Sequence, residues 1–229
     1  MTYLKIDFWN FQDLMHHRVH EILLLSSPYD AFILEEDGRL TEQILHEYIG
    51  MSLNYAPRVW RASTASQARE MLEKKKFDLV LVMMRISDMD PITFGQLVKE
   101  KNKNMPVILL VFDESELKQI PENLPKDTID KIFVYSGNAN LFPAVIKFVE
   151  DKKNVKRDVK KGGVRAIILI EDSPQYYSIM LPMIYKEILY HTRNLISKSL
   201  DDTHRLLQMR GRPKILLASS YEEAKKYYK

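Results

Sequence analysis

Residues 77–91 read FDLVLVMMRISDMDP, and this stretch decides the fold. Residues 79–84, six uncharged and mostly branched or flexible apolar side chains, follow Asp78 and are too few to make a helix of their own. A polar turn comes directly after them. A short apolar run bounded in this way is typical of a strand buried on both faces, which is the usual centre of a parallel sheet.

The rest of the chain alternates apolar runs with amphipathic stretches. Strands alternating with helices predict a doubly wound α/β fold with a five-stranded parallel sheet, and the expected strand order is 2-1-3-4-5, the flavodoxin-like arrangement. A short lead-in helix is expected within residues 7–20. The other expected strands are 21–25, 58–62, 106–112 and 131–135, and the expected helices are about 29–55, 65–75, 92–102 and 140–152.

The stretch 78–90 resembles the third strand and following loop of response-regulator receiver domains, whose common form is D-L-V-L-L-D-x-R-M-P-D-M-D-G. Members of this family accept a phosphoryl group from a histidine kinase on an aspartate. The resemblance implies a CheY-like fold, a role in two-component signal transduction or a phosphorelay, and protein partners such as a histidine kinase or an output domain. The family's acceptor aspartate falls on Met83, whose thioether cannot form an acyl phosphate.

The resemblance also implies where the other reactive groups should stand. An active receiver has an acidic pair that holds Mg²⁺ after the first strand, a Ser or Thr after the fourth and a Lys after the fifth. We therefore expect a non-catalytic pseudo-receiver that acts as a regulatory, docking or dimerisation module. The acidic pair falls on Ser26 and Ser27, or on Leu25 and Ser26 in the other register, and the remaining positions fall on Val111 and Tyr135.

After the first unit the strand and helix pattern begins again. Residues 57–63 align without gaps on residues 213–219, which predicts an internal repeat. The second copy ends before its third strand, so we expect the chain to be part of a longer protein and to self-associate through an unpaired strand edge. The predicted division is a lead-in segment 1–20, a receiver-like domain 21–152, a charged linker 153–163 and the N-terminal half of a second receiver-like domain 164–229.

Two sets of residues are weighed as metal ligands. Glu171 and Asp172 stand where the family places its acidic pair, and they could hold Mg²⁺ if the second domain were complete. The alternative is a pair of acids that only stabilises a helix N-terminus. His16 and His20 have a spacing that metals can use, but a solvated helix face explains them better. No cofactor is expected in this chain, and Mg²⁺ is expected only for a complete second receiver.

Composition limits the remaining classes of function. The chain has 229 residues and no cysteine, which excludes disulfides and cysteine zinc sites. Its formal net charge is only +3, which makes nucleic acid an unexpected partner. No apolar run approaches the roughly 18 residues needed to span a bilayer, so a cytoplasmic location is expected. Three other interpretations stay open: the N-terminal regulatory region of a larger enzyme, a flavodoxin-like cofactor-binding module, and a DNA-binding regulator.

Overall fold

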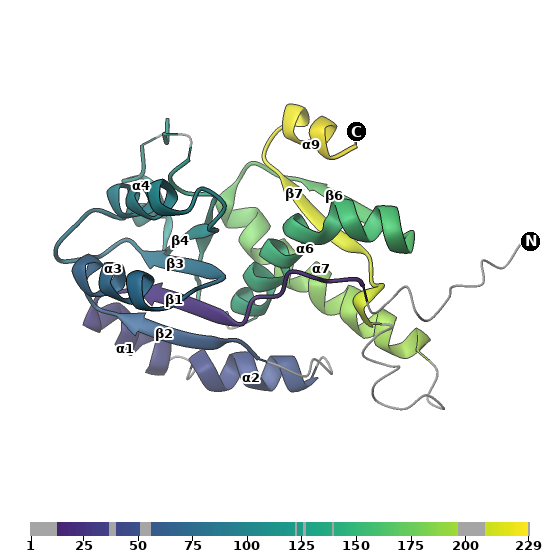
Figure 1. Cartoon of the computed structure of the whole chain (residues 1–229), viewed down its shortest axis with the longest axis horizontal. Helices are drawn as coiled ribbons and strands as arrows, with labels where there is room; N and C mark the ends of the chain where they lie inside the picture. The colour runs from purple at the N-terminus through teal and green to yellow at the C-terminus, as the bar shows by residue number, and fades with distance from the viewer. Residues whose placement is uncertain are drawn as a thin grey trace, which may run out of the picture.

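The protein consists of two parallel sheets joined by one long helix, α6 (Figure 1). The computed structural model describes residues 13–36, 40–50, 56–121, 123–125, 127–138, 140–196 and 209–228. The larger sheet has five parallel strands in the order β2-β1-β3-β4-β5, which confirms the predicted fold and strand order. The smaller sheet pairs β6 with β7, also in parallel.

The elements follow the predicted alternation closely. The strands are β1 (Glu21–Leu25), β2 (Arg58–Ala62), β3 (Leu79–Met83), β4 (Val107–Val111), β5 (Lys131–Val134), β6 (Ala166–Ile170) and β7 (Lys214–Ala218). The helices are α1 (Pro28–Glu36), α2 (Leu40–Gly50), α3 (Ala65–Lys74), α4 (Pro91–Lys101), α5 (Glu114–Leu117), α6 (Leu141–Gly162), α7 (Pro174–Leu195) and α9 (Tyr221–Tyr228).

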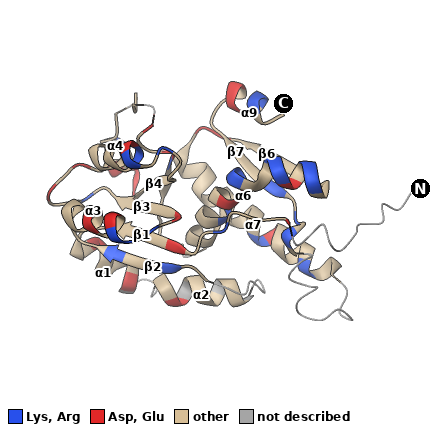
Figure 2. Ribbon diagram, in the orientation of Figure 1, with Lys and Arg blue, Asp and Glu red and all other residues tan. Residues whose placement is uncertain are grey.

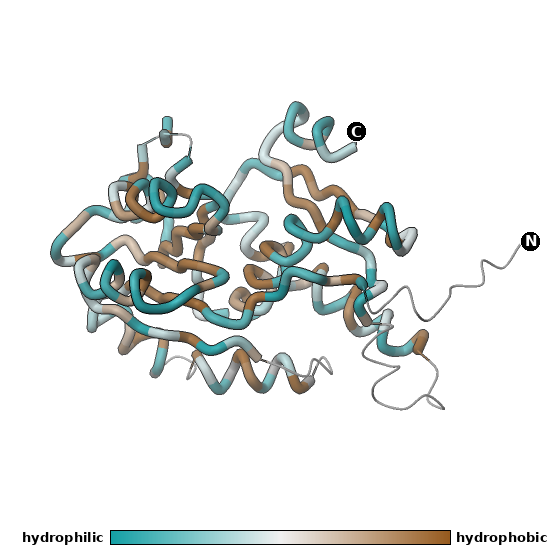
Figure 3. Tube along the Cα trace, in the orientation of Figure 1, coloured by the Kyte–Doolittle hydropathy of each residue, from teal (hydrophilic) through white to brown (hydrophobic). Residues whose placement is uncertain are grey.

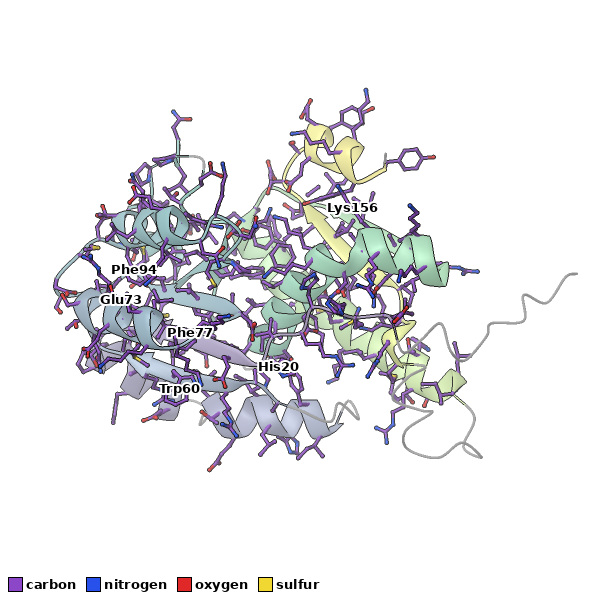
Figure 4. The ribbon with its side chains drawn as sticks, viewed as in Figure 1. His20, Trp60, Glu73, Phe77, Phe94 and Lys156 are labelled. Carbon is purple, nitrogen blue, oxygen red and sulfur yellow. The ribbon has the colours of Figure 1, made fainter. Side chains whose placement is uncertain are left out.

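Helices cover both faces of the larger sheet, and this explains the composition of its central strands. β3 and β4 carry no charged residue (Figure 2), are hydrophobic along their length (Figure 3) and are buried at every position. One face packs against α1, α2 and α6. The other packs against α3 and α4, and Phe77 and Phe94, labelled in Figure 4, belong to the core on that side.

Two of the predicted helices are shorter than expected. The helix expected over residues 29–55 is two helices, α1 and α2, and residues 37–39 and 51–55 lie outside the described part. In the second unit the sequence pattern after Pro174 predicts a long helix to about Met209. The described helix, α7, ends at Leu195, and residues 197–208 also lie outside the described part. Among the helices that the structure describes, none combines the length and apolar character needed to cross a membrane.

The predicted lead-in helix is wrong for the part that is described. Residues 13–20 are not helical, and residues 1–12 lie outside the described part. The segment 13–20 instead runs along α6, whose polar side chains accept hydrogen bonds from its backbone N–H groups, so its backbone is satisfied without a helix of its own. The donors and acceptors are Met15 N and Asp158 (3.2 Å), His17 N and Asn154 (2.9 Å), and Val19 N and Glu150 (3.0 Å).

The charged run 153–163, expected to be a linker between the two units, is helical, because these residues continue α6 to Gly162. Gly163 ends the helix in the left-handed region at φ 60°, and its N–H bonds back to the carbonyls of Asp158 and Val159. The charged run looks solvated in the sequence. In the structure, however, one side of the helix is buried and polar, with Glu150, Asn154 and Asp158 spaced one turn apart.

Asp151 connects α6 to the second unit through a fully buried cluster. Its carboxylate accepts two hydrogen bonds from the Arg212 guanidinium, at 2.8 and 2.9 Å, in bidentate geometry. It also accepts the Tyr185 hydroxyl at 3.0 Å and the Ile215 N–H at 2.9 Å. The Asp151 charge is therefore paired and hydrogen-bonded on every side, as a buried carboxylate requires.

A second buried pair lies about two turns further along α6. Lys214 Nζ lies 3.1 Å from Asp158, and both side chains are fully buried. Lys214 also donates to the carbonyl of Arg210 at 2.8 Å. Burial lowers the pKa of Lys214 to about 8, with the nearby Arg212 charge adding to the effect and the two aspartates opposing it. The two units thus share charges across α6 and do not form two independent bodies.

Helix α7 covers the outer edge of the larger sheet. The Ser178 hydroxyl accepts a hydrogen bond from Val134 N at 2.9 Å, and the Tyr177 hydroxyl donates to the Ile132 carbonyl. Both partners belong to β5, whose outer edge would otherwise present unpaired backbone groups. The Tyr177 ring also packs edge-on against Phe133, with ring centroids 5.3 Å apart. The second unit therefore protects the edge of the first sheet.

Candidate functional site

The carboxyl ends of parallel strands meet at one edge of the sheet, which is where ligands bind in this class of fold. β1 ends at Leu25, β3 at Met83 and β4 at Val111, and Tyr135 follows β5. The register places Leu25 opposite Val82, and Met83 opposite Leu110. The predicted site positions therefore do gather at this edge.

The backbone makes the same hydrogen bond after the first strand of each sheet. Ser26 N donates to the Ala62 carbonyl at 3.1 Å, just as Glu171 N donates to the Ala218 carbonyl at 2.9 Å in the smaller sheet. Ser26 is thus the counterpart of Glu171. Ser27 follows it and accepts the Asp30 N–H with its hydroxyl at 3.0 Å, at the start of α1. The first unit therefore has two hydroxyl side chains, those of Ser26 and Ser27, directly after β1.

The other three positions are occupied by core side chains. Met83 and Val111 are fully buried, and Tyr135 is nearly so. The Tyr135 ring packs against Phe112 and Phe142, with centroids 6.1 and 5.4 Å away. Met83 and Tyr135 belong to the same hydrophobic core. At the two positions where the sequence resemblance expects a nucleophile and a cation, the side chains are therefore packed in the hydrophobic core.

Three charged residues that the sequence reasoning did not single out meet at the same edge. Arg85, two residues after Met83, binds Glu116 with Nη2 at 2.8 Å and Nε at 3.0 Å. Its guanidinium also lies 3.8 Å from Asp30. Both carboxylates are buried, with exposed fractions of 5% for Glu116 and 1% for Asp30. We call these three residues the ionic triad.

Within the ionic triad Asp30 is the less well satisfied carboxylate, because its buried Oδ1 has no hydrogen-bond partner among the described residues. Burial raises the pKa of Asp30, and the Glu116 charge adds to this, while the Ser27 hydroxyl and Arg85 oppose it. The hydrogen bond to Glu116 raises the pKa of Arg85. Glu116 is anchored a second time, because its other oxygen accepts Phe112 N at 2.8 Å. The Arg85 guanidinium thus carries the positive charge that faces both carboxylates, Glu116 and Asp30.

Asp88 and Asp90 have structural partners. Asp88 accepts hydrogen bonds from Ala65 N at 2.7 Å and from Ser66 N at 3.0 Å, which tie the loop to the start of α3. These bonds lower the pKa of Asp88. Asp90 is the N-cap of α4 and accepts the Ile92 N–H at 3.0 Å. Both acids are committed to helix N-termini.

The residues present do not fit a magnesium site in the first unit, since Ser26, Ser27 and Met83 offer no carboxylate. In the second unit, Glu171 accepts the Ser173 N–H at 3.0 Å and Asp172 is exposed. Within the described residues no group of three His, Asp or Glu side chains is arranged to hold a metal, and this includes His16 and His20.

Comparison with known proteins points to one family. Residues 32–133 match the sequence profile of the response regulator receiver domain, and no curated protein gave a significant match. Similar solved structures include the response regulator TrrA from Thermotoga maritima in complex with Mg²⁺ and BeF, at 17% identity and TM-score 0.43, covering 57% of this chain and 98% of that one. The receiver domain of a putative Luxo repressor protein from Vibrio parahaemolyticus matches at 14% identity and TM-score 0.45, covering 64% and 99%.

Proposed function

We propose, from the premise that residues 32–133 form a response regulator receiver domain, that the first unit of this chain is a pseudo-receiver that takes no phosphoryl group. It serves two-component signalling as a constitutive docking or regulatory module without catalysis of its own. The observation that carries the proposal is the ionic triad beside a buried Met83. Its partners would be proteins, a histidine kinase or an output domain.

The chemistry of phosphoryl transfer supports this proposal. Transfer relies on a carboxylate nucleophile and on cations positioned to stabilise charge on the phosphoryl oxygens. Met83 offers a thioether, and Tyr135 stands where the family carries an ammonium group. The positive charge of Arg85 is already bound to Glu116 and faces Asp30. The charges at this site are therefore paired with one another, with neither metal nor phosphate taking part. Such a site would keep the same arrangement at all times, as expected of a constitutive module.

The second unit is proposed to be the N-terminal half of another receiver. It has the order β6-α7-β7-α9, and its parallel strands pair over five residues as β1 and β2 do. The same backbone hydrogen bond follows each first strand. Glu171 and Asp172 would bind Mg²⁺ only with the remaining strands of such a domain. The match to the receiver family does not favour the enzyme or cofactor-binding alternatives.

The direct test is chemical labelling of the whole chain with acetyl phosphate and Mg²⁺, followed by intact-mass measurement and peptide mapping. We expect no phosphoryl adduct, because no described carboxylate at this edge is both unpaired and placed beside a metal site. Stoichiometric acid-stable or acid-labile labelling within residues 21–152 would contradict the pseudo-receiver proposal. The same sample without Mg²⁺ serves as the control for non-specific acylation.

The exposed strand β6 is proposed to mediate self-association. Ile167 and Ile170 are 39% and 55% exposed, and among the described residues no strand pairs with the outer edge of β6. Such an edge recruits another strand. We expect sedimentation equilibrium at micromolar concentrations to show dimers. Ile167→Lys should shift the protein to monomer, whereas Ile49→Lys, at a position on α2 that is 65% exposed, should not. A monomeric wild-type chain would contradict the proposal.

A further inference from the structure

A cavity of about 420 Å³ lies at the opposite end of the larger sheet from the ionic triad. It is bounded by Pro106, which precedes β4, by Asp130, which precedes β5, and by the side of α6 around Phe148. Volumes of a few hundred Å³ are typical of sites for small molecules. No residue of this cavity belongs to the ionic triad or to the carboxyl ends of the strands, so the two sites are separate.

Four lysines line the cavity, and they differ in whether they form ion pairs with carboxylates. Lys99 is buried and binds Asp130 at 2.6 Å, while Asp130 is also held by Val107 N at 2.8 Å. Lys103 lies 3.4 Å from the exposed Asp127 at the rim. The cavity therefore has one ion pair inside and one at its rim, and its excess positive charge comes from Lys152 and Lys153.

Lys152 and Lys153 are the cations that α6 presents to the cavity. The Lys152 ammonium lies 5.9 Å from the centre of the Phe148 ring. Burial lowers the pKa of Lys153, with Lys99 adding to the effect and two aspartates opposing it. Among the described residues, no carboxylate lies within ion-pair distance of either ammonium. Two lysines that line the same cavity without an ion-pair partner offer positive charge to an anion.

The remaining wall of the cavity is apolar. Pro106, Ile108, Phe148 and Val149 line it, and all four are buried in the sheet and helix core. Ammonium groups above an apolar floor suit a ligand that carries both negative charge and an organic body. Lysines bind phosphate groups as compact point charges.

We propose that this cavity binds a small phosphorylated molecule of nucleotide size, with its phosphates on Lys103, Lys152 and Lys153 and its organic part against Phe148. A nucleic acid fits less well, because the other basic residues of α6, such as Lys156 (Figure 4) and Lys160, do not line the cavity. The inference does not depend on the pseudo-receiver proposal, since it uses none of the same residues.

The test is isothermal titration calorimetry of the whole chain with ATP in the absence of Mg²⁺, alongside inorganic pyrophosphate and adenosine as its separate parts. We expect saturable one-to-one binding of ATP that weakens with salt. Pyrophosphate should bind more weakly than ATP and adenosine should show little affinity. The variant K152Q/K153Q should bind ATP at least about tenfold more weakly, as loss of two charge-assisted contacts predicts.

The matched control is K156Q/K160Q, which removes the same number of charges from exposed positions of the same helix outside the cavity. It should bind ATP as the wild type does, and both variants should keep the wild-type melting temperature. The proposal is overturned if ATP does not bind, if both double variants lose affinity equally, or if pyrophosphate binds as tightly as ATP. Tighter binding of a duplex oligonucleotide than of ATP, with dependence on Lys156 and Lys160, would overturn it as well.

Discussion

Replacing Asp151 with alanine is expected to destabilise the whole chain by about 3–5 kcal/mol, the usual cost of leaving one partner of a buried ion pair uncompensated. The change would leave the Arg212 guanidinium, whose side chain is 2% exposed, without its counter-charge. It would also remove the hydrogen-bond acceptor of the Tyr185 hydroxyl and the Ile215 N–H. Equilibrium unfolding in urea, followed by circular dichroism, measures the loss. Because Asp151 joins both units through α6, we expect a single unfolding transition that moves as a whole.

Two controls separate the buried charge from the helix itself. Lys152→Ala, one residue further on and exposed, should change the free energy of unfolding by no more than about 0.5 kcal/mol. The double variant D151L/R212M should recover much of the stability lost in Asp151→Ala, since it removes both charges together. A loss below about 1 kcal/mol in Asp151→Ala, or two separate transitions in the wild type, would show that the two units are not coupled through this cluster.

Replacing Met83 with aspartate, the residue that active receivers carry, is expected to destabilise the protein by at least about 3 kcal/mol and to restore no phosphorylation. Met83 is fully buried in the core beside Tyr135. A carboxylate there would lie in apolar surroundings near the ionic triad, whose only cation, Arg85, is bound to Glu116. Thermal and urea unfolding report the destabilisation, and acetyl phosphate labelling reports the chemistry.

The control for volume is Met83→Leu, which should cost less than about 1.5 kcal/mol because it keeps the size and polarity of the side chain. Millimolar Mg²⁺ should stabilise neither variant, because Ser26 and Ser27 supply no carboxylate to a metal. If Met83→Asp were as stable as Met83→Leu, or if Mg²⁺ stabilised it and labelling appeared, the site would have kept its metal-binding capacity and the pseudo-receiver proposal would fail.

The larger sheet could be predicted from the sequence because its signals are local. The run 79–84 contains only residues that suit a strand covered on both faces, and 2-1-3-4-5 is a common strand order of doubly wound sheets. Thr64 at the start of α3 accepts the Gln67 N–H with its hydroxyl at 3.1 Å, as a serine or threonine before a helix predicts. In such cases the nearest neighbours in the chain decide the structure.

The errors arose where distant residues decide the structure. The charged run at 153–163 looked like a linker, but Asp158 is buried because Lys214, far along the chain, lies against it. Glu150, Asn154 and Asp158 are spaced four residues apart, and this spacing was the signal in the sequence of a polar helix face. Likewise Glu116 belongs to the site only because a turn of helix brings it to Arg85. Pairs of this kind become visible only in the folded chain.

The contacts between α7 and β5 determine how a partner can approach the larger sheet. The Val134 N–H and the Ile132 carbonyl already have side-chain partners in Ser178 and Tyr177. A peptide that binds by adding a strand needs free main-chain groups along a sheet border. On the β5 side it would first have to displace a 22-residue helix. Among the described hydrogen bonds none joins a helix to a backbone group of β2, so strand addition to the larger sheet is directed to its β2 border.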